Sequence, residues 1–81
     1  MKIDPFTRST ICRVAHDFAL VLENAKAQGA SEDRLREFAD LCLEKFRQDQ
    51  QGTFPAYVDT LVGELATAID AHRKALGRRI S

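Results

Sequence analysis

The side chains best suited to bind a metal ion in this sequence are two cysteines and two histidines, Cys12, His16, Cys42 and His72. Two cysteine and two histidine ligands make up a common structural zinc site. Cys12 and His16 are four residues apart, which places them on one face of a helix if that segment is helical. Whether Cys42 and His72 can join them depends on how the elements of the fold are arranged.

A second group with chemical potential is a run of basic residues at the C-terminal end. Residues 73–81 contain no acidic residue and four basic ones, Arg73, Lys74, Arg78 and Arg79. The remaining residues carry a net charge of −4, so the whole chain is neutral and lacks the overall charge of a nucleic-acid binder. Two interpretations stay open: the cations offset the dipole at a helix end, or they form a short basic arm that contacts phosphates or an acidic protein surface.

Motifs for catalysis are missing from the sequence. It contains no glycine-rich phosphate loop and no Ser-His-Asp arrangement. Cys42 lies between Leu41 and Leu43, which favours a small buried side chain over a nucleophile. The positions expected to face inwards are almost wholly apolar and leave no polar pocket for a charged substrate. We therefore predict a protein that is not an enzyme, with no cofactor, no metal and no small-molecule substrate.

The elements that position these residues are three helices at about 5–28, 32–50 and 54–76. Each segment shows the helical period of apolar residues and is bounded by residues that start and stop helices. The expected N-terminal caps are Asp4, Ser31 and Thr53, and the expected stops are Gly29, Gly52 and Gly77. The connections are so short that neighbouring helices must run antiparallel. The sequence thus predicts an all-α fold, a three-helix antiparallel (up-down-up) bundle, as a single domain over residues 1–81.

Three apolar stripes are expected to form one core. They comprise Ile11, Val14, Ala15, Phe18, Leu22 and Ala25; then Leu35, Phe38, Ala39, Cys42 and Phe46; then Phe54, Val58, Leu61, Leu65, Ile69, His72 and Leu76. If the helices lie alongside one another, Cys42 is level with His16, while His72 is level with about residue 27 of the first helix. His72 then lies roughly 15 Å along the bundle axis from Cys42, too far for a four-ligand metal site.

Four apolar residues, Ile3, Phe6, Leu41 and Leu43, fall beside these stripes. One interpretation is a wide stripe, with the N-terminal segment folded over the end of the bundle. The other is an exposed patch that binds a protein partner or a second copy of the chain. We predict a small protein-interaction module that acts as an adaptor, inhibitor or regulator through a helical face. The alternative is an accessory protein that associates with nucleic acid through the basic C-terminal end.

The cellular location can also be predicted from the sequence. Two cysteines are too few for a disulfide-rich secreted domain, and the residues after Met1 do not resemble a signal peptide. No apolar run approaches the roughly 18 to 20 residues that a membrane-spanning helix needs. We expect a cytoplasmic protein without a membrane span.

Overall fold

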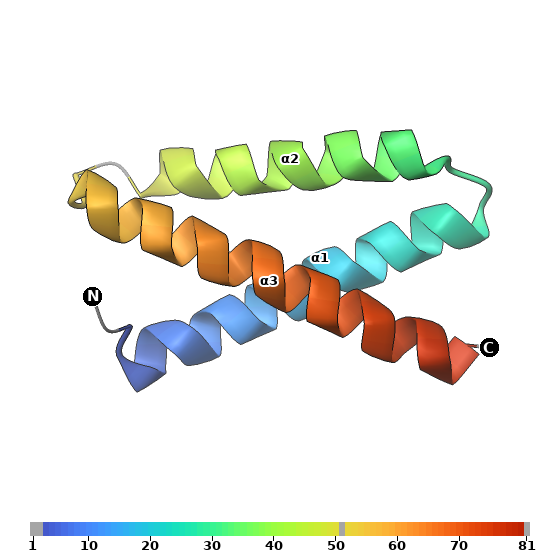
Figure 1. Cartoon of the computed structure of the whole chain (residues 1–81), viewed down its shortest axis with the longest axis horizontal. Coiled ribbons are helices and arrows are strands. Elements are labelled where there is room, and N and C mark those ends of the chain that lie inside the picture. The colour runs from blue at the N-terminus through green and yellow to red at the C-terminus, as the bar shows by residue number, and fades with distance from the viewer. Residues whose placement is uncertain (1–2, 51, 81) are drawn as a thin grey trace.

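Three helices account for nearly all of the regular structure in the computed structural model, which describes residues 3–50 and 52–80, with side chains up to Arg78. They are α1 (Pro5–Ala27), α2 (Glu32–Asp49) and α3 (Pro55–Ile80). The chain runs along the long axis in α1, returns in α2 and runs forward again in α3 (Figure 1). The predicted all-α, up-down-up arrangement is therefore confirmed.

The predicted starts of α1 and α2 are confirmed by side-chain caps. The carboxylate of Asp4 accepts a hydrogen bond from the backbone N–H of Thr7 at 2.8 Å, and Pro5 begins α1. The hydroxyl of Ser31 accepts from the backbone N–H of Arg34 at 3.2 Å. These bonds satisfy N–H groups that have no partner within the helix.

The two connections contain glycines in the left-handed backbone region, which favours glycine because it lacks a Cβ. Gly29 has a φ angle of 101° and Gly52 one of 88°, as expected for residues that stop α1 and α2. Gly77 behaves differently. It stays within α3, which continues to Ile80, so the prediction that the third helix ends near residue 76 was wrong. The start was also misplaced, because α3 begins at Pro55 and the residue before it is Phe54 rather than Thr53.

The main packing contact of the fold joins α1 to α3, and α2 makes a smaller contact with each of them. Figure 1 shows α3 crossing over α1 near the middle of both helices, while α2 extends along one side. Ala15 and Ala19 on α1 are completely buried. Side chains this small let two helix axes approach closely, since the distance between axes depends on the residues at the contact.

The core lies around this crossing. Its buried residues include Ile11, Ala15 and Leu22 of α1, Leu35 of α2, and Leu61, Leu65 and Ile69 of α3. Half-buried side chains such as Val14, Phe18, Leu43 and Phe46 pack around them. Two residues that were predicted to lie in the core are instead exposed. Phe38 is 43% exposed because α2 is only partly covered, and Phe54 is 68% exposed because it precedes the first turn of α3.

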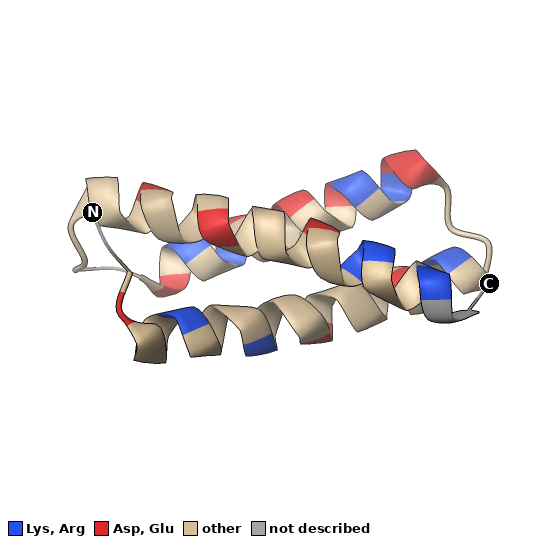
Figure 2. Cartoon of the chain, turned by 60° about the horizontal axis from the view of Figure 1, so that its bottom comes forward, with Lys and Arg blue, Asp and Glu red and all other residues tan. Residues whose placement is uncertain are grey.

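In the part of the chain that the structure describes, no helix has the length and apolarity needed to cross a lipid bilayer. Charged residues of both signs are spread over all three helices, as Figure 2 shows for Lys, Arg, Asp and Glu.

The core assignment predicts very different effects for two leucine-to-alanine substitutions. Leu65 is completely buried, so Leu65→Ala should lower the free energy of unfolding by about 2–5 kcal/mol or prevent folding altogether. Leu20 is 39% exposed and lies on α1 outside the core, so Leu20→Ala should cost no more than about 1 kcal/mol. Urea unfolding followed by circular dichroism measures both. Equal losses of stability would contradict the core described above.

Candidate functional site

Three large apolar side chains are exposed on α1 and α2, and we call them the apolar patch: Val21, Phe38 and Leu41. Phe38 and Leu41 are three residues apart on α2 and therefore share a face of that helix. Val21 of α1 and Phe38 line the same shallow groove, whose walls are almost entirely apolar. Leu41 is 67% exposed and Val21 48% exposed. Large apolar side chains gathered in this way mark surfaces that bind other molecules.

The four residues predicted as partner-binding do not form one exposed surface. Phe6 and Leu41 are strongly exposed. Ile3 is buried and joins the core, and Leu43 is half-buried and packs against it. The expectation that all four form a contiguous patch is therefore wrong. Ile3, which precedes α1, belongs to the core cluster. Leu43 lines the cleft between α2 and α3, whereas Leu41 does not.

Two members of the apolar patch were missed by sequence analysis. Phe38 was assigned to the core because it matches the helical period of Leu35 and Cys42, and Val21 was left unassigned. A usable signal was the pair Phe38 and Leu41, two large apolar residues three positions apart that share a face of α2 beside the core stripe.

A second candidate site is a cleft of about 340 Å³ between the three helices. Its floor is apolar and includes Leu22, Leu43 and Ile69. We call it the charged cleft, because the side chains around it and the adjoining hollow include Glu23, Lys26, Glu32, Arg36, Asp70, Arg73 and Lys74. The inward positions had been predicted to be almost wholly apolar, and among the described residues the buried ones are all hydrophobic. The charges line the rim of the cleft, where Glu23 and Arg73 are half-buried and the others are exposed.

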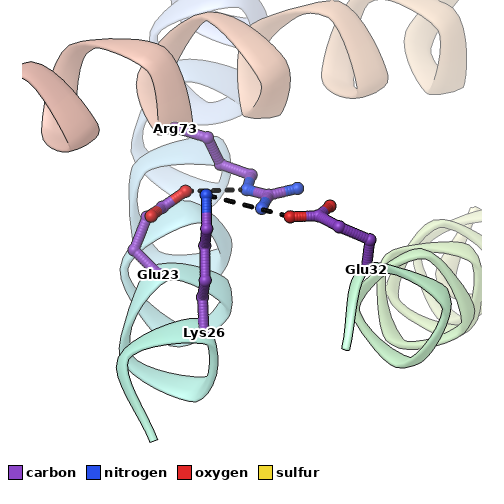
Figure 3. A network of polar contacts seen from close by, with 4 residues as sticks. All are labelled: Glu23, Lys26, Glu32 and Arg73. Atoms are coloured by element: carbon purple, nitrogen blue, oxygen red, sulfur yellow. Dashed lines mark hydrogen bonds and ion pairs between the residues drawn. The ribbon is translucent and has the colours of Figure 1, made fainter. Parts of the chain in front are cut away.

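Ion pairs join the three helices at the charged cleft (Figure 3). The Nε atom of Arg73 on α3 donates to Oε1 of Glu23 on α1 at 2.9 Å, and both side chains are largely shielded from water. Lys26 Nζ lies 3.8 Å from Oε1 of Glu32, which links α1 to α2, but both of these side chains are exposed. Exposed pairs contribute little to stability, whereas a shielded pair is costly to break. The Glu23–Arg73 pair is therefore the structurally important one.

Two of the basic residues that were predicted to make a contact at the C-terminal end are engaged in ion pairs. Arg73 is bound to Glu23, and Lys74 Nζ lies 3.1 Å from Oδ2 of Asp70. Arg78 is exposed, and the side chain of Arg79 lies outside the described residues. The prediction of a free basic arm therefore does not hold for Arg73 and Lys74, which are partnered by acids of α1 and α3.

The cysteines and histidines occupy positions that partly differ from those predicted. The rings of His16 and His72 lie 5.6 Å apart, edge to face. The prediction that His72 lies level with residue 27 of the first helix was wrong, because α3 crosses α1 instead of running alongside it. Cys12 is exposed and Cys42 is half-buried, and both are free thiols. Within residues 3–50 and 52–80, no three His, Cys, Asp or Glu side chains form a group that could hold a metal ion.

The environment of Cys42 is that of a packed side chain. Removal from water raises the pKa of its thiol above the usual value, and the charge of Lys45 opposes this effect more weakly. A raised pKa keeps the thiol protonated, and the protonated form is not the nucleophile.

Comparison of the chain with protein-family models, with curated proteins and with solved structures finds no match. Functional inference therefore starts from the geometry of the apolar patch and the charged cleft.

The shielding of the Glu23–Arg73 pair predicts strong energetic coupling between the two residues. Glu23→Gln and Arg73→Gln should each lower the free energy of unfolding by about 1–3 kcal/mol, because each leaves a shielded charge without its partner. The double substitution should cost clearly less than the sum of the two. Lys74→Gln, which removes one member of an exposed pair, is the matched control and should cost about 0.5 kcal/mol or less. Urea unfolding measures all four variants, and additive losses would contradict the pairing.

Proposed function

We propose that this protein is a small, non-enzymatic protein-interaction module that acts as an adaptor, inhibitor or regulator through the exposed face of α2. The observation that supports the proposal is the apolar patch. Within the described part of α2, Leu35 is the fully buried residue, whereas Leu41 and Phe38 reach solvent, and Phe38 lines a groove together with Val21 of α1. Covering large apolar side chains that are exposed to water lowers the free energy, so their exposure favours binding of a partner.

The composition around the apolar patch also supports this role. Phe38 and Leu41 are flanked on the same helix by exposed charged residues: Arg34, Glu37, Glu44 and Lys45. An apolar centre with a polar and charged rim is the usual organisation of a protein–protein interface. In such interfaces a few central side chains, often aromatic, account for most of the binding energy.

The charged cleft fits a structural role better than a catalytic one. Its best-shielded groups, Glu23 and Arg73, neutralise each other, so neither is left to bind a substrate of opposite charge. The same pair weakens the alternative of association with nucleic acid through the basic end, because Arg73 is no longer available to a phosphate. That alternative remains a prediction.

We further propose that the protein acts in the cytoplasm. Both cysteines are free thiols, and Cys12 is exposed. An exposed free thiol is stable in a reducing compartment and is prone to oxidation outside it.

Partner binding should depend on the apolar patch. Phe38→Ser together with Leu41→Ser should weaken capture of the partner from native host lysate by about tenfold or more, with helicity unchanged by circular dichroism. Phe54→Ser is the matched control, since Phe54 is also a large, exposed apolar residue but lies just before α3, outside α2. Capture is measured by affinity purification and mass spectrometry with nuclease present. Full capture by the double variant would contradict the proposal, and loss of all partners on nuclease treatment would favour the nucleic-acid alternative.

A further inference from the structure

We infer that His16 of α1 and His72 of α3 together bind one divalent transition-metal ion of the Zn²⁺ type, which bridges the two helices near their crossing. The two imidazole rings lie 5.6 Å apart, centroid to centroid, with their planes inclined at 73°. Imidazole nitrogens are common ligands of such ions. The site involves neither the apolar patch nor the charged cleft, so this inference is independent of the proposed function.

The separation of the two rings matches the geometry of a shared ion. Zn²⁺ lies about 2.0–2.1 Å from a bound imidazole nitrogen, and therefore about 3.2 Å from the centre of that ring. Two rings bound to one tetrahedral ion then have centroids roughly 5.2 Å apart. The 5.6 Å separation in the structure differs from this value by less than about half an ångström. Rotation of each ring about its last side-chain bond, which has a broad torsional range, can aim both rings at one ion without moving either helix.

Both rings are attached to firmly packed parts of the fold. His16 follows Ala15, which is completely buried, and His72 lies three residues after the buried Ile69. The largest packing contact of the described structure joins the two helices that carry these residues. Ligands held by packed helices lose little conformational freedom when an ion binds, so the pair is preorganised.

The pair is open to solvent and supplies two ligands. His16 is exposed and His72 is half-buried, so an ion can reach the rings from solvent. Within residues 3–50 and 52–80, no third His, Cys, Asp or Glu side chain completes a group of three ligands. Water therefore fills the remaining positions on the ion. Such an ion exchanges with solvent more readily than one enclosed by four protein ligands.

The prediction from the sequence that the chain binds no metal depended partly on the distance between His72 and Cys42. That distance excludes a site with two cysteine and two histidine ligands when the helices lie side by side. The crossing of α1 and α3 places His72 beside His16 instead. The pair needs neither cysteine, so the earlier argument does not apply to it.

Cys12 offers a competing pair within α1. It is exposed and lies four residues before His16, so the two side chains share a face of the helix. A thiol must lose its proton before it binds an ion, whereas a neutral imidazole binds directly. An ion held by Cys12 and His16 would not join two helices, and this difference makes the two sites distinguishable by experiment.

A bridge between helices links metal binding to folding. The two ligands belong to different helices, so they come together when the chain is folded. An ion that binds the folded form more tightly than the unfolded form stabilises it by mass action. At a Zn²⁺ concentration about a hundredfold above the dissociation constant, the melting temperature of a chain this small should rise by about 5 °C or more.

Titration calorimetry with Zn²⁺, and thermal unfolding with and without it, test the site. The wild type should bind one ion per chain. His16→Gln and His72→Phe should each weaken binding by about tenfold or more, since loss of a residue that merely supports a metal ligand already costs about 10–100-fold. Phenylalanine keeps an aromatic ring at the half-buried position 72, so His72→Phe separates loss of the ligand from loss of packing.

Cys12→Ser is the control and should leave both the affinity and the rise in melting temperature unchanged. If the wild type binds no Zn²⁺ even at millimolar concentration, the two rings are in contact through packing alone and the inference is wrong. Binding that is lost with Cys12→Ser but kept with His72→Phe would place the ion on α1 and overturn the bridge. Binding that leaves the melting temperature of the wild type unchanged would overturn it as well.

Discussion

The close crossing of α1 and α3 is the contact on which the rest of the structure depends. Figure 1 shows the two helices crossing near their middles and diverging towards their ends. Ala15 and Ala19 of α1 are completely buried, and side chains this small allow a neighbouring helix to approach closely. The divergence opens the charged cleft at one end, where Arg73 reaches Glu23. The crossing also places His72 next to His16. Helices lying side by side in the expected register would not make this contact.

Because the largest packing contact joins α1 to α3, α2 is covered less by the other two helices. One of its flanks, with Leu43 and Arg36, lines the charged cleft towards α3. The opposite flank, with Arg34 and Phe38, borders the groove next to α1 and continues outwards to Leu41. The second flank is where the chain retains large apolar side chains in contact with water. Their retention has a physical explanation if another surface covers them, since each exposed side chain of this kind gives up favourable burial.

Features set by local chemistry could be predicted from the sequence. The three helices, the caps at Asp4 and Ser31, and the left-handed glycines at Gly29 and Gly52 each depend on residues within a few positions. Gly77 was predicted to end the third helix and does not. A glycine ends a helix only when its φ angle is positive, and no neighbouring residue forces Gly77 into that conformation. Leu41 was also identified as a candidate contact residue, since it lies off the core stripe.

Features set by the angle between helices could not be predicted in the same way. A stripe on a helical wheel shows which side is apolar, but not how far a neighbouring helix covers it. Phe38 and Leu35 look equivalent on such a wheel, although Leu35 is buried and Phe38 reaches solvent. Glu23 and Arg73 lie at the edges of their stripes, and their shielding arises because the crossing aligns them across the charged cleft.

Folding and association are linked in a chain built this way. A small helical domain with a core of a few leucines and isoleucines has a modest free energy of unfolding, and a partner that binds only the folded form adds to it by mass action. Along α2, Leu35 is buried in the core, Leu43 and Phe46 pack against it, and Arg47 pairs with Asp59 of α3. The helix is thus held along its length, and the flank with Phe38 and Leu41 is what stays uncovered. A partner that covered this flank would add its binding free energy to the folded form without having to order the helix first.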